Sequence, residues 1–177
     1  MTENSIRYDN NTDVSAKIAE LTKDGPAIIM IDWDRCGYCK ATHEFLETDP
    51  AKRAATTTVH SFEISNTTMR DFVKANLGDG KIFSKLDNGG LAVNDPTSGT
   101  QMRFGTPTFL FLKQGGEYAG AHMGGIMNME AYQALQAKFK AATSVGKQTR
   151  LDVTPVDTLA APAFAAAEVS KSAARAA

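Results

Sequence analysis

The chain contains only two cysteines, and they lie three positions apart in the stretch Cys36-Gly37-Tyr38-Cys39. A structural disulfide framework needs cysteines spread along the chain, so that each bridge closes a long loop. A bridge within this tetrapeptide would close a very short loop and add little stability through chain entropy. Two thiols at this spacing suit disulfide exchange, in which one thiolate attacks and the other displaces the mixed disulfide.

The segments on either side of the motif would position both sulfurs. Residues 27–31 (AIIMI) are nearly all apolar and predict a buried strand, and residues 40–47 have helical character. At the first turn of a helix, unpaired backbone N–H groups and the helix dipole stabilise an anion. We therefore expect Cys36 to be exposed at this positive helix end and Cys39 to lie one turn further in, more buried.

A Cys-x-x-Cys pair can also be half of a zinc site. No further cysteine exists, and the only histidines are His43, His60 and His122. His43 lies one helical turn past Cys39, so a three-ligand site with Cys36 is conceivable, but structural zinc normally takes four ligands in paired clusters. We expect no metal and no other cofactor, and we interpret His43 as a solvated helix residue.

The rest of the pattern predicts an α/β protein. The expected order is helix, strand, helix, strand, helix, hairpin, helix, which calls for a central sheet covered by helices. Residues 1–12 form a polar lead-in, and residues 13–143 form one domain. Within it, residues 81–103 are weakly patterned and are interpreted as an insertion, with room for a short helix near residues 82–86. Asp49–Pro50 is expected to end the helix that follows the cysteines.

Residues 144–177 differ in composition. From Leu151 onward, ten of 27 residues are alanine, and few large apolar residues remain to form a core. Such a composition favours a disordered or loosely attached tail. The alternative is a docking strap in residues 151–177 that attaches the domain to a partner or lies on the domain itself. Four apolar residues would form it: Val153, Val156, Leu159 and Phe164.

Charge and hydropathy exclude several classes of protein. The 19 basic and 20 acidic residues give a formal charge of -1, which provides no electrostatic footprint for nucleic acid or an anionic membrane. The longest apolar stretch is far too short for a transmembrane segment. The polar start lacks the pattern of a signal peptide. We expect a soluble, cytoplasmic protein, with association to a particle or complex through the tail as the alternative.

Three segments resemble the thioredoxin superfamily. Residues 27–40 (AIIMIDWDRCGYCK) resemble its first core strand and active-site helix, and residues 104–109 (FGTPTF) resemble its Gly-x-Pro-Thr segment. Gly115-Gly116-Glu117 followed by Gly124–Gly125 resembles the closing hairpin and the glycine before the last helix. The resemblance implies a thioredoxin fold, with a central mixed β-sheet flanked by helices, an insertion before the cis-proline strand and an extended C-terminal tail.

The resemblance also implies roles for single residues. Pro107 would form a cis peptide that faces the sulfurs, and the backbone of Thr106 would pair with an extended substrate. The other residues expected at the substrate site are Trp33, Gly37, Tyr38 and Gly124.

Two positions depart from ordinary thioredoxins. Gly37-Tyr38 replaces their Gly-Pro and resembles bacterial periplasmic disulfide isomerases, which implies a less strongly reducing site. Met30 stands where the family has a buried aspartate that accepts a proton. Asp32 lies two residues further on the same strand face. Our hypothesis is that Asp32 partly handles the proton of Cys39, and the alternative is an exposed carboxylate at the strand end.

The expected function is thiol–disulfide oxidoreduction on protein disulfides. Cys36 would attack, Cys39 would resolve the mixed disulfide, and the partners would be protein thiols and disulfides. The alternative is a structural or assembly component on a thioredoxin scaffold, tethered to a larger complex by residues 151–177.

Overall fold

A computed structural model of the chain describes residues 4–54 and 57–144. The expected tail therefore lies outside the described residues from position 145 onward, and so does the whole expected docking strap. No helix in the described part is both long enough and apolar enough to cross a bilayer.

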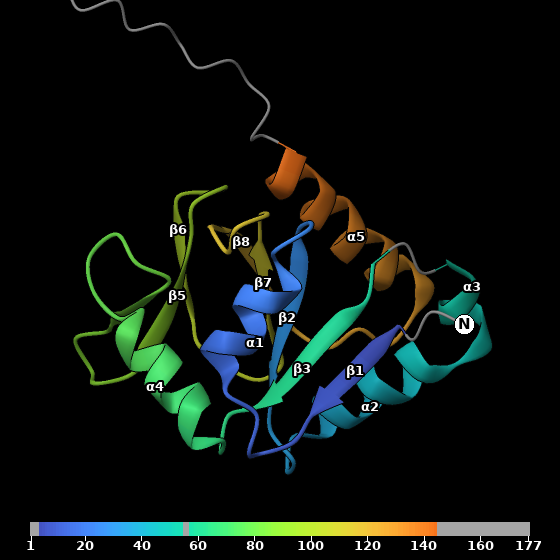
Figure 1. Cartoon of the computed structure of the whole chain (residues 1–177), viewed down its shortest axis with the longest axis horizontal. Coiled ribbons are helices and arrows are strands. Elements are labelled where there is room, and N and C mark those ends of the chain that lie inside the picture. Colours follow the sequence, from blue (N-terminus) through green and yellow to red (C-terminus); the bar gives the residue numbers. More distant parts are fainter. Residues whose placement is uncertain (1–3, 55–56, 145–177) are drawn as a thin grey trace, which may run out of the picture. The chain divides into compact units, whose positions relative to one another are not determined.

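A five-stranded mixed sheet forms the centre of the domain, in the order β1-β3-β2-β7-β8 (Figure 1). Neighbouring β1, β3 and β2 run parallel, whereas β7 is antiparallel to β2 and β8 is antiparallel to β7. The strands span Ser5–Tyr8 (β1), Ala27–Asp32 (β2), Val59–Glu63 (β3), Thr108–Leu112 (β7) and Tyr118–Met123 (β8).

Helices cover both faces of this sheet. Residues of α1 and α4 pack into one core layer and residues of α2 and α5 into the other, and Figure 1 shows α4 to the left of the sheet and α2, α3 and α5 to its right. Side chains cap three of these helices: Asp13 before α1, Asn66 before α4 and Asn128 before α5. The helices span Val14–Leu21 (α1), Gly37–Glu47 (α2), Asp49–Ala54 (α3), Thr67–Ala75 (α4) and Met129–Ser144 (α5).

The central strand β2 divides the core into two layers. Ile29 and Ile31 pack with the α1 and α4 side, whereas Ile28 and Met30 pack with both cysteines and with α5. This alternation follows from the period of two along a strand whose faces are both buried. The strand order, the strand directions and the two helical layers confirm the expected thioredoxin fold.

The expected N-terminal lead-in contributes a strand. Ser5–Tyr8 pairs in register with residues 59–62 of β3, and Tyr8 stacks on Phe62 with ring centroids 4.7 Å apart. This strand has only four residues, and one of them is an arginine. Its alternation of apolar and polar residues is therefore too short to predict a strand from the sequence. The sheet therefore begins before residue 13, where we expected the domain to start.

The segment expected as an insertion forms a second sheet, in the order β4-β5-β6. Its antiparallel strands span Phe83–Lys85, Leu91–Asp95 and Thr100–Arg103. The short helix expected near residues 82–86 is wrong, because Phe83 and Val93 pair across the sheet and bury their side chains in the α1–α4 core. Asp49–Pro50 follows the end of α2, as expected. The same two residues also begin a further short helix, α3, because proline is tolerated in the first turn of a helix.

Candidate active site

Cys36 caps the N-terminus of α2, the helix that begins at Gly37. The backbone N–H of Cys39 donates to the Cys36 sulfur over 3.1 Å, and the Cys36 N–H donates to the carbonyl of Trp33 over 3.0 Å. The buried strand β2 leads into this turn and fixes where the helix starts. The sequence prediction that both cysteines open a helix is confirmed.

The two sulfurs occupy different environments. Both cysteines are free thiols and both are buried: Cys36, which we expected to be exposed, is only 9% exposed because it packs into the core beneath the Thr106 loop, and Cys39 is 2% exposed. Burial opposes ionisation of Cys36, but hydrogen bonds from Cys39 and Thr106 and from the N–H groups of Cys39 and Tyr38 outweigh it and lower the Cys36 pKa. Burial, together with the neighbouring Cys36 sulfur, raises the pKa of Cys39 to about 12. Cys36 is therefore the thiol that ionises more readily.

The loop before β7 faces the sulfurs. The Thr106–Pro107 peptide bond is cis. The Cys36 thiol donates to the carbonyl oxygen of Thr106 over 3.3 Å, and the N–H of Gly124 donates to the carbonyl of Pro107 over 3.2 Å. The fold therefore brings Cys36, Thr106, Pro107 and Gly124 together from three distant parts of the chain.

Three large apolar side chains are exposed near this loop and helix. Trp33 is 43% exposed, Tyr38 is 62% exposed and Met127 is 51% exposed. Tyr38 lies against Gly125, where a side-chain carbon would come within 3.3 Å of the tyrosine. The sequence prediction named Trp33 and Tyr38 but missed Met127, whose only signal was its place just after Gly124–Gly125.

Thr42 of α2 holds the loop that contains Ile126 and Met127, between β8 and α5, against this helix. Its hydroxyl donates to the carbonyl of Tyr38 over 2.8 Å and accepts from the N–H of Ile126 over 2.9 Å. Thr42 is fully buried, so this contact is shielded from water. The position of the Met127 loop beside Tyr38 is therefore fixed by the active-site helix itself.

His43 is not the solvated residue that we expected. It is 2% exposed, and its Nε2 lies 2.8 Å from Oδ2 of Asp32. The expectation failed because the strand side of α2 includes the position four residues after Cys39, and a polar side chain there can be satisfied by partners from the sheet. The signal in the sequence was the spacing of four residues from Cys39, which places His43 on the same side of the helix as that buried cysteine. Asp32 lies on the face of β2 that we expected, and its described contacts are with His43 and Ser61.

Among the described residues, no group of three histidine, cysteine, aspartate or glutamate side chains is placed to hold a metal ion. Neither cysteine is in a metal-binding cluster there.

Comparison with known proteins finds similarity only at the level of solved structures. No family model and no curated protein matches the chain. Thioredoxin f from spinach chloroplast is 18% identical, with 79% of this chain and 94% of that chain covered and a TM-score of 0.44. Thioredoxin from Trichomonas vaginalis is 13% identical, with coverage of 78% and 100% and a TM-score of 0.48.

A third structure, the thioredoxin NaTrxh from Nicotiana alata, is 14% identical, with 81% of this chain and 96% of that chain covered and a TM-score of 0.47. These likenesses are weak. The fold assignment comes from the strand order, the strand directions and the helical layers of this chain.

Proposed function

We propose that this chain is a thiol–disulfide oxidoreductase whose redox couple is Cys36 and Cys39. The observation that carries the proposal is the asymmetry of the two sulfurs. Cys36 is the more exposed thiol and has a lowered pKa, whereas Cys39 lies behind it with a raised pKa. An attacking sulfur must be a thiolate and accessible, and a resolving sulfur must be close and protected, so the two environments suit the two roles.

The proposed reaction begins with the Cys36 thiolate and a disulfide of a protein substrate. Cys36 attacks one substrate sulfur, a new S–S bond forms, and the other substrate sulfur leaves with the electron pair of the broken bond. Cys39 then loses its proton and attacks the Cys36 sulfur. The Cys36–Cys39 bond forms, and the second substrate thiolate leaves. The substrate gains two electrons, the pair of cysteines loses two, and the reverse sequence oxidises a substrate dithiol.

The surroundings of Cys36 support a polypeptide substrate. The exposed side chains of Trp33, Tyr38 and Met127 offer apolar contacts, and the Thr106 loop offers backbone groups to an extended segment. Gly37 has open space where a side chain would stand, so the main chain beside Cys36 is approachable. Pro107 and Gly124, joined by a backbone hydrogen bond, lie beside this loop.

Two cysteine variants test the proposal. We expect wild-type protein to reduce insulin with dithiothreitol and to oxidise a dithiol peptide, and we expect Cys36→Ser to lose both activities by at least about a hundredfold. Cys39→Ser should still attack but should accumulate a mixed disulfide, visible as a mass increase equal to one substrate. Equal activity of Cys36→Ser and wild type would contradict the proposal.

A further inference from the structure

A second group of reactive side chains lies where β1 meets α2, and it includes neither cysteine. The Ser5 hydroxyl lies 3.2 Å from Nδ1 of His43, and Nε2 of His43 lies 2.8 Å from Oδ2 of Asp32. Ser61 donates to the same Asp32 oxygen over 2.8 Å. Serine, histidine and aspartate therefore form one chain of hydrogen bonds. Serine hydrolases use this order for a nucleophile, its base and the carboxylate that orients the base.

The carboxylate decides which ring nitrogen of His43 carries the proton. An ionised carboxylate only accepts hydrogen bonds, so a neutral His43 donates from Nε2 to Asp32. Its Nδ1 is then an acceptor, and the Ser5 hydroxyl donates to it. In serine proteases the two nitrogens have the opposite partners, but either nitrogen can take the proton of a serine. The base therefore points at the proton that Ser5 has to lose before its oxygen attacks.

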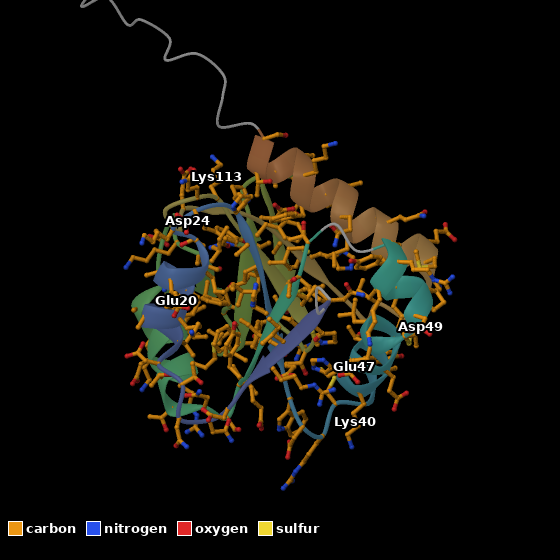
Figure 2. All side chains as sticks on the ribbon, turned by 45° about the vertical axis from the view of Figure 1, so that its right-hand side comes forward. Glu20, Asp24, Lys40, Glu47, Asp49 and Lys113 are labelled. Carbon is orange, nitrogen blue, oxygen red and sulfur yellow. The ribbon has the colours of Figure 1, made fainter. Side chains whose placement is uncertain are left out.

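Ser5 is partly exposed and lines a cavity of about 320 Å³. The walls come from the chain around β1, from the end of α2 and from α3: Asn4 to Arg7, Leu46, Glu47 and Lys52. Alternate side chains of a strand point to opposite faces, so a wall of consecutive residues places the cavity along the strand edge. Figure 2 shows Glu47 at the end of α2 on the side of β1, and this residue lies 3.8 Å from Arg7.

The edge of β1 offers donors for the charge that develops on an attacked carbonyl. β1 is the edge strand of the central sheet, and the N–H of Val59 in β3 donates to the carbonyl of Asn4 over 2.9 Å. Backbone groups alternate in direction along a strand, so the N–H groups of Ser5 and Arg7 point away from β3. Backbone N–H groups beside the nucleophile stabilise the tetrahedral oxyanion of acyl transfer.

The cavity favours a ligand with a negative charge. Arg7 and Lys52 contribute two positive charges and Glu47 contributes one negative charge, and all three residues are exposed. Asn4 is 2% exposed, and its Oδ1 has no hydrogen-bond partner among the described residues. A buried acceptor without a donor is unfavourable, so this wall also favours a ligand that supplies an N–H or O–H group.

We propose that Ser5, His43 and Asp32 form a second active site, which hydrolyses carboxylic esters that carry a negative charge. Ser5 is the nucleophile and His43 is its base. Asp32 is a positioning residue, because it acts through His43 by fixing the position of the ring proton. This activity goes beyond the proposed disulfide exchange and uses neither cysteine.

The reaction balances with water as the co-reactant. The Ser5 oxygen attacks the ester carbonyl while its proton passes to Nδ1 of His43, and Asp32 stabilises the positive charge of the ring. The bond between the carbonyl carbon and the leaving oxygen breaks, and the alcohol departs with the proton from His43. A water then gives a proton to His43 and attacks the acyl group. The carboxylic acid leaves as the Ser5 oxygen takes that proton back.

Covalent labelling of the full-length protein tests the nucleophile. A fluorophosphonate phosphonylates activated serines. We expect wild type to take up one phosphonyl group per chain at Ser5, at a rate at least about a hundredfold above that of the urea-unfolded protein. Ser5→Ala should abolish this label. Ser65→Ala, which removes a hydroxyl that donates to the carboxylate of Glu63, is the matched control and should label like wild type. Equal labelling of folded and unfolded protein at Ser5 would overturn the proposal.

The Asp32→Asn variant tests the positioning of His43. Its amide keeps the shape of the carboxylate but can donate to Nε2, so the ring proton can move to Nδ1 and block acceptance from Ser5. We expect the limiting labelling rate to fall at least about a hundredfold, with the probe concentration for half-saturation unchanged within about twofold. An unchanged limiting rate in the folded variant would mean that the cluster is only structural. If the variant does not fold, wild type and Ser5→Ala decide.

Two acetate esters test the substrate class. Neutral 4-nitrophenyl acetate and anionic 4-acetoxy-3-nitrobenzoate both release a coloured phenolate. The assay uses the double variant Cys36→Ala and Cys39→Ala, because a thiolate also attacks activated esters. We expect kcat/KM to be at least about tenfold higher for the anionic ester, and Lys52→Ala to reduce this preference to about threefold or less. Equal kcat/KM for the two esters would contradict the substrate class, and hydrolysis no faster than with Ser5→Ala would contradict the activity.

The outcomes separate the two proposals. If wild type reduces insulin but Ser5 does not label, the disulfide exchange stands and the second site is wrong. If Ser5 labels and Cys36→Ser reduces insulin as well as wild type does, the second site stands and the proposed function fails. Labelling of Ser5 that persists in Cys36→Ser, which has lost insulin reduction, supports both and shows that the two sites are independent.

Discussion

At the scale of single residues, two identical side chains are separated by their surroundings. Cys36 receives an N–H hydrogen bond at the helix start and is 9% exposed, whereas Cys39 lies one turn deeper with 2% of its surface exposed. The sequence predicted that Cys39 would be the deeper of the two, but it wrongly predicted that Cys36 would be exposed. It did not predict His43, because a lone histidine on a helix is usually solvated and its partners Ser5, Asp32 and Ser61 come from three separate strands.

The lowered pKa of Cys36 predicts a pH dependence for its reactivity. A thiol with a lowered pKa is ionised at lower pH, so alkylation of Cys36 should persist as the pH falls below the usual range of a free cysteine. In the Cys39→Ser variant, which isolates Cys36, iodoacetamide should react with a midpoint below about 8.5. The unfolded variant in urea serves as the control, and coincident profiles for the folded and unfolded protein would contradict the assigned environment.

At the scale of elements, two short segments form strands, β1 and β4, that the sequence pattern did not predict. The pattern predicted β2, β3, β7 and the helices other than α3, because their apolar residues repeat over enough positions. It missed β1, whose four residues include an exposed arginine, and it misjudged residues 82–86. β1 forms by pairing with the distant strand β3, and β4 forms by pairing with its neighbour β5, and neither pairing is encoded in the local propensity of the segment itself.

The burial of His60, a β3 residue that pairs with β1, predicts that the free energy of unfolding falls in acid. Burial, with a smaller effect from Lys17, lowers the pKa of His60 to about 4, whereas an unfolded histidine titrates near about 6.5. Between these values the unfolded chain binds a proton that the folded chain does not, so the free energy of unfolding falls as the pH falls through this window. Below about pH 4 this contribution no longer changes.

Because His60 is only partly buried, we expect it to account for a loss of about 1–2 kcal/mol between pH 7 and pH 4. Urea unfolding of wild type and His60→Gln at both values measures it. The variant should lose less stability on acidification than the wild type, with other titrating groups contributing equally to both. Parallel losses would show that His60 does not titrate differently in the two states.

The second sheet should be an integral part of the fold. Phe83 is fully buried and contacts Phe104 edge-to-face, with ring centroids 5.9 Å apart. Phe83→Ala should therefore lower the free energy of unfolding by about 3–5 kcal/mol. Lys85→Ala, an exposed position on the same strand, should change it by less than about 0.5 kcal/mol. A cost below about 1 kcal/mol for Phe83→Ala would mean that the second sheet is only loosely attached.

At the scale of the whole molecule, the sheet separates two regions. The cysteines, the Asp32–His43 pair and α5 lie on one side, while Phe83 and Val93 of the second sheet join the core on the other. The sequence predicted the first region through its motif and located the second only as a segment of unusual pattern. The assembly role expected for residues 151–177 stays a prediction, since those residues lie outside the described ones.

The reduction potential of the Cys36–Cys39 couple tests the central claim most directly. Full-length protein is equilibrated in glutathione and dithiothreitol buffers of graded potential, and thiols are counted by alkylation and mass spectrometry. We predict one two-electron transition in the folded protein, between about −270 and −120 mV, with both cysteines changing together. If both thiols remain free and alkylatable in every oxidising buffer while the protein stays folded, the two sulfurs do not form a redox couple and the account is contradicted.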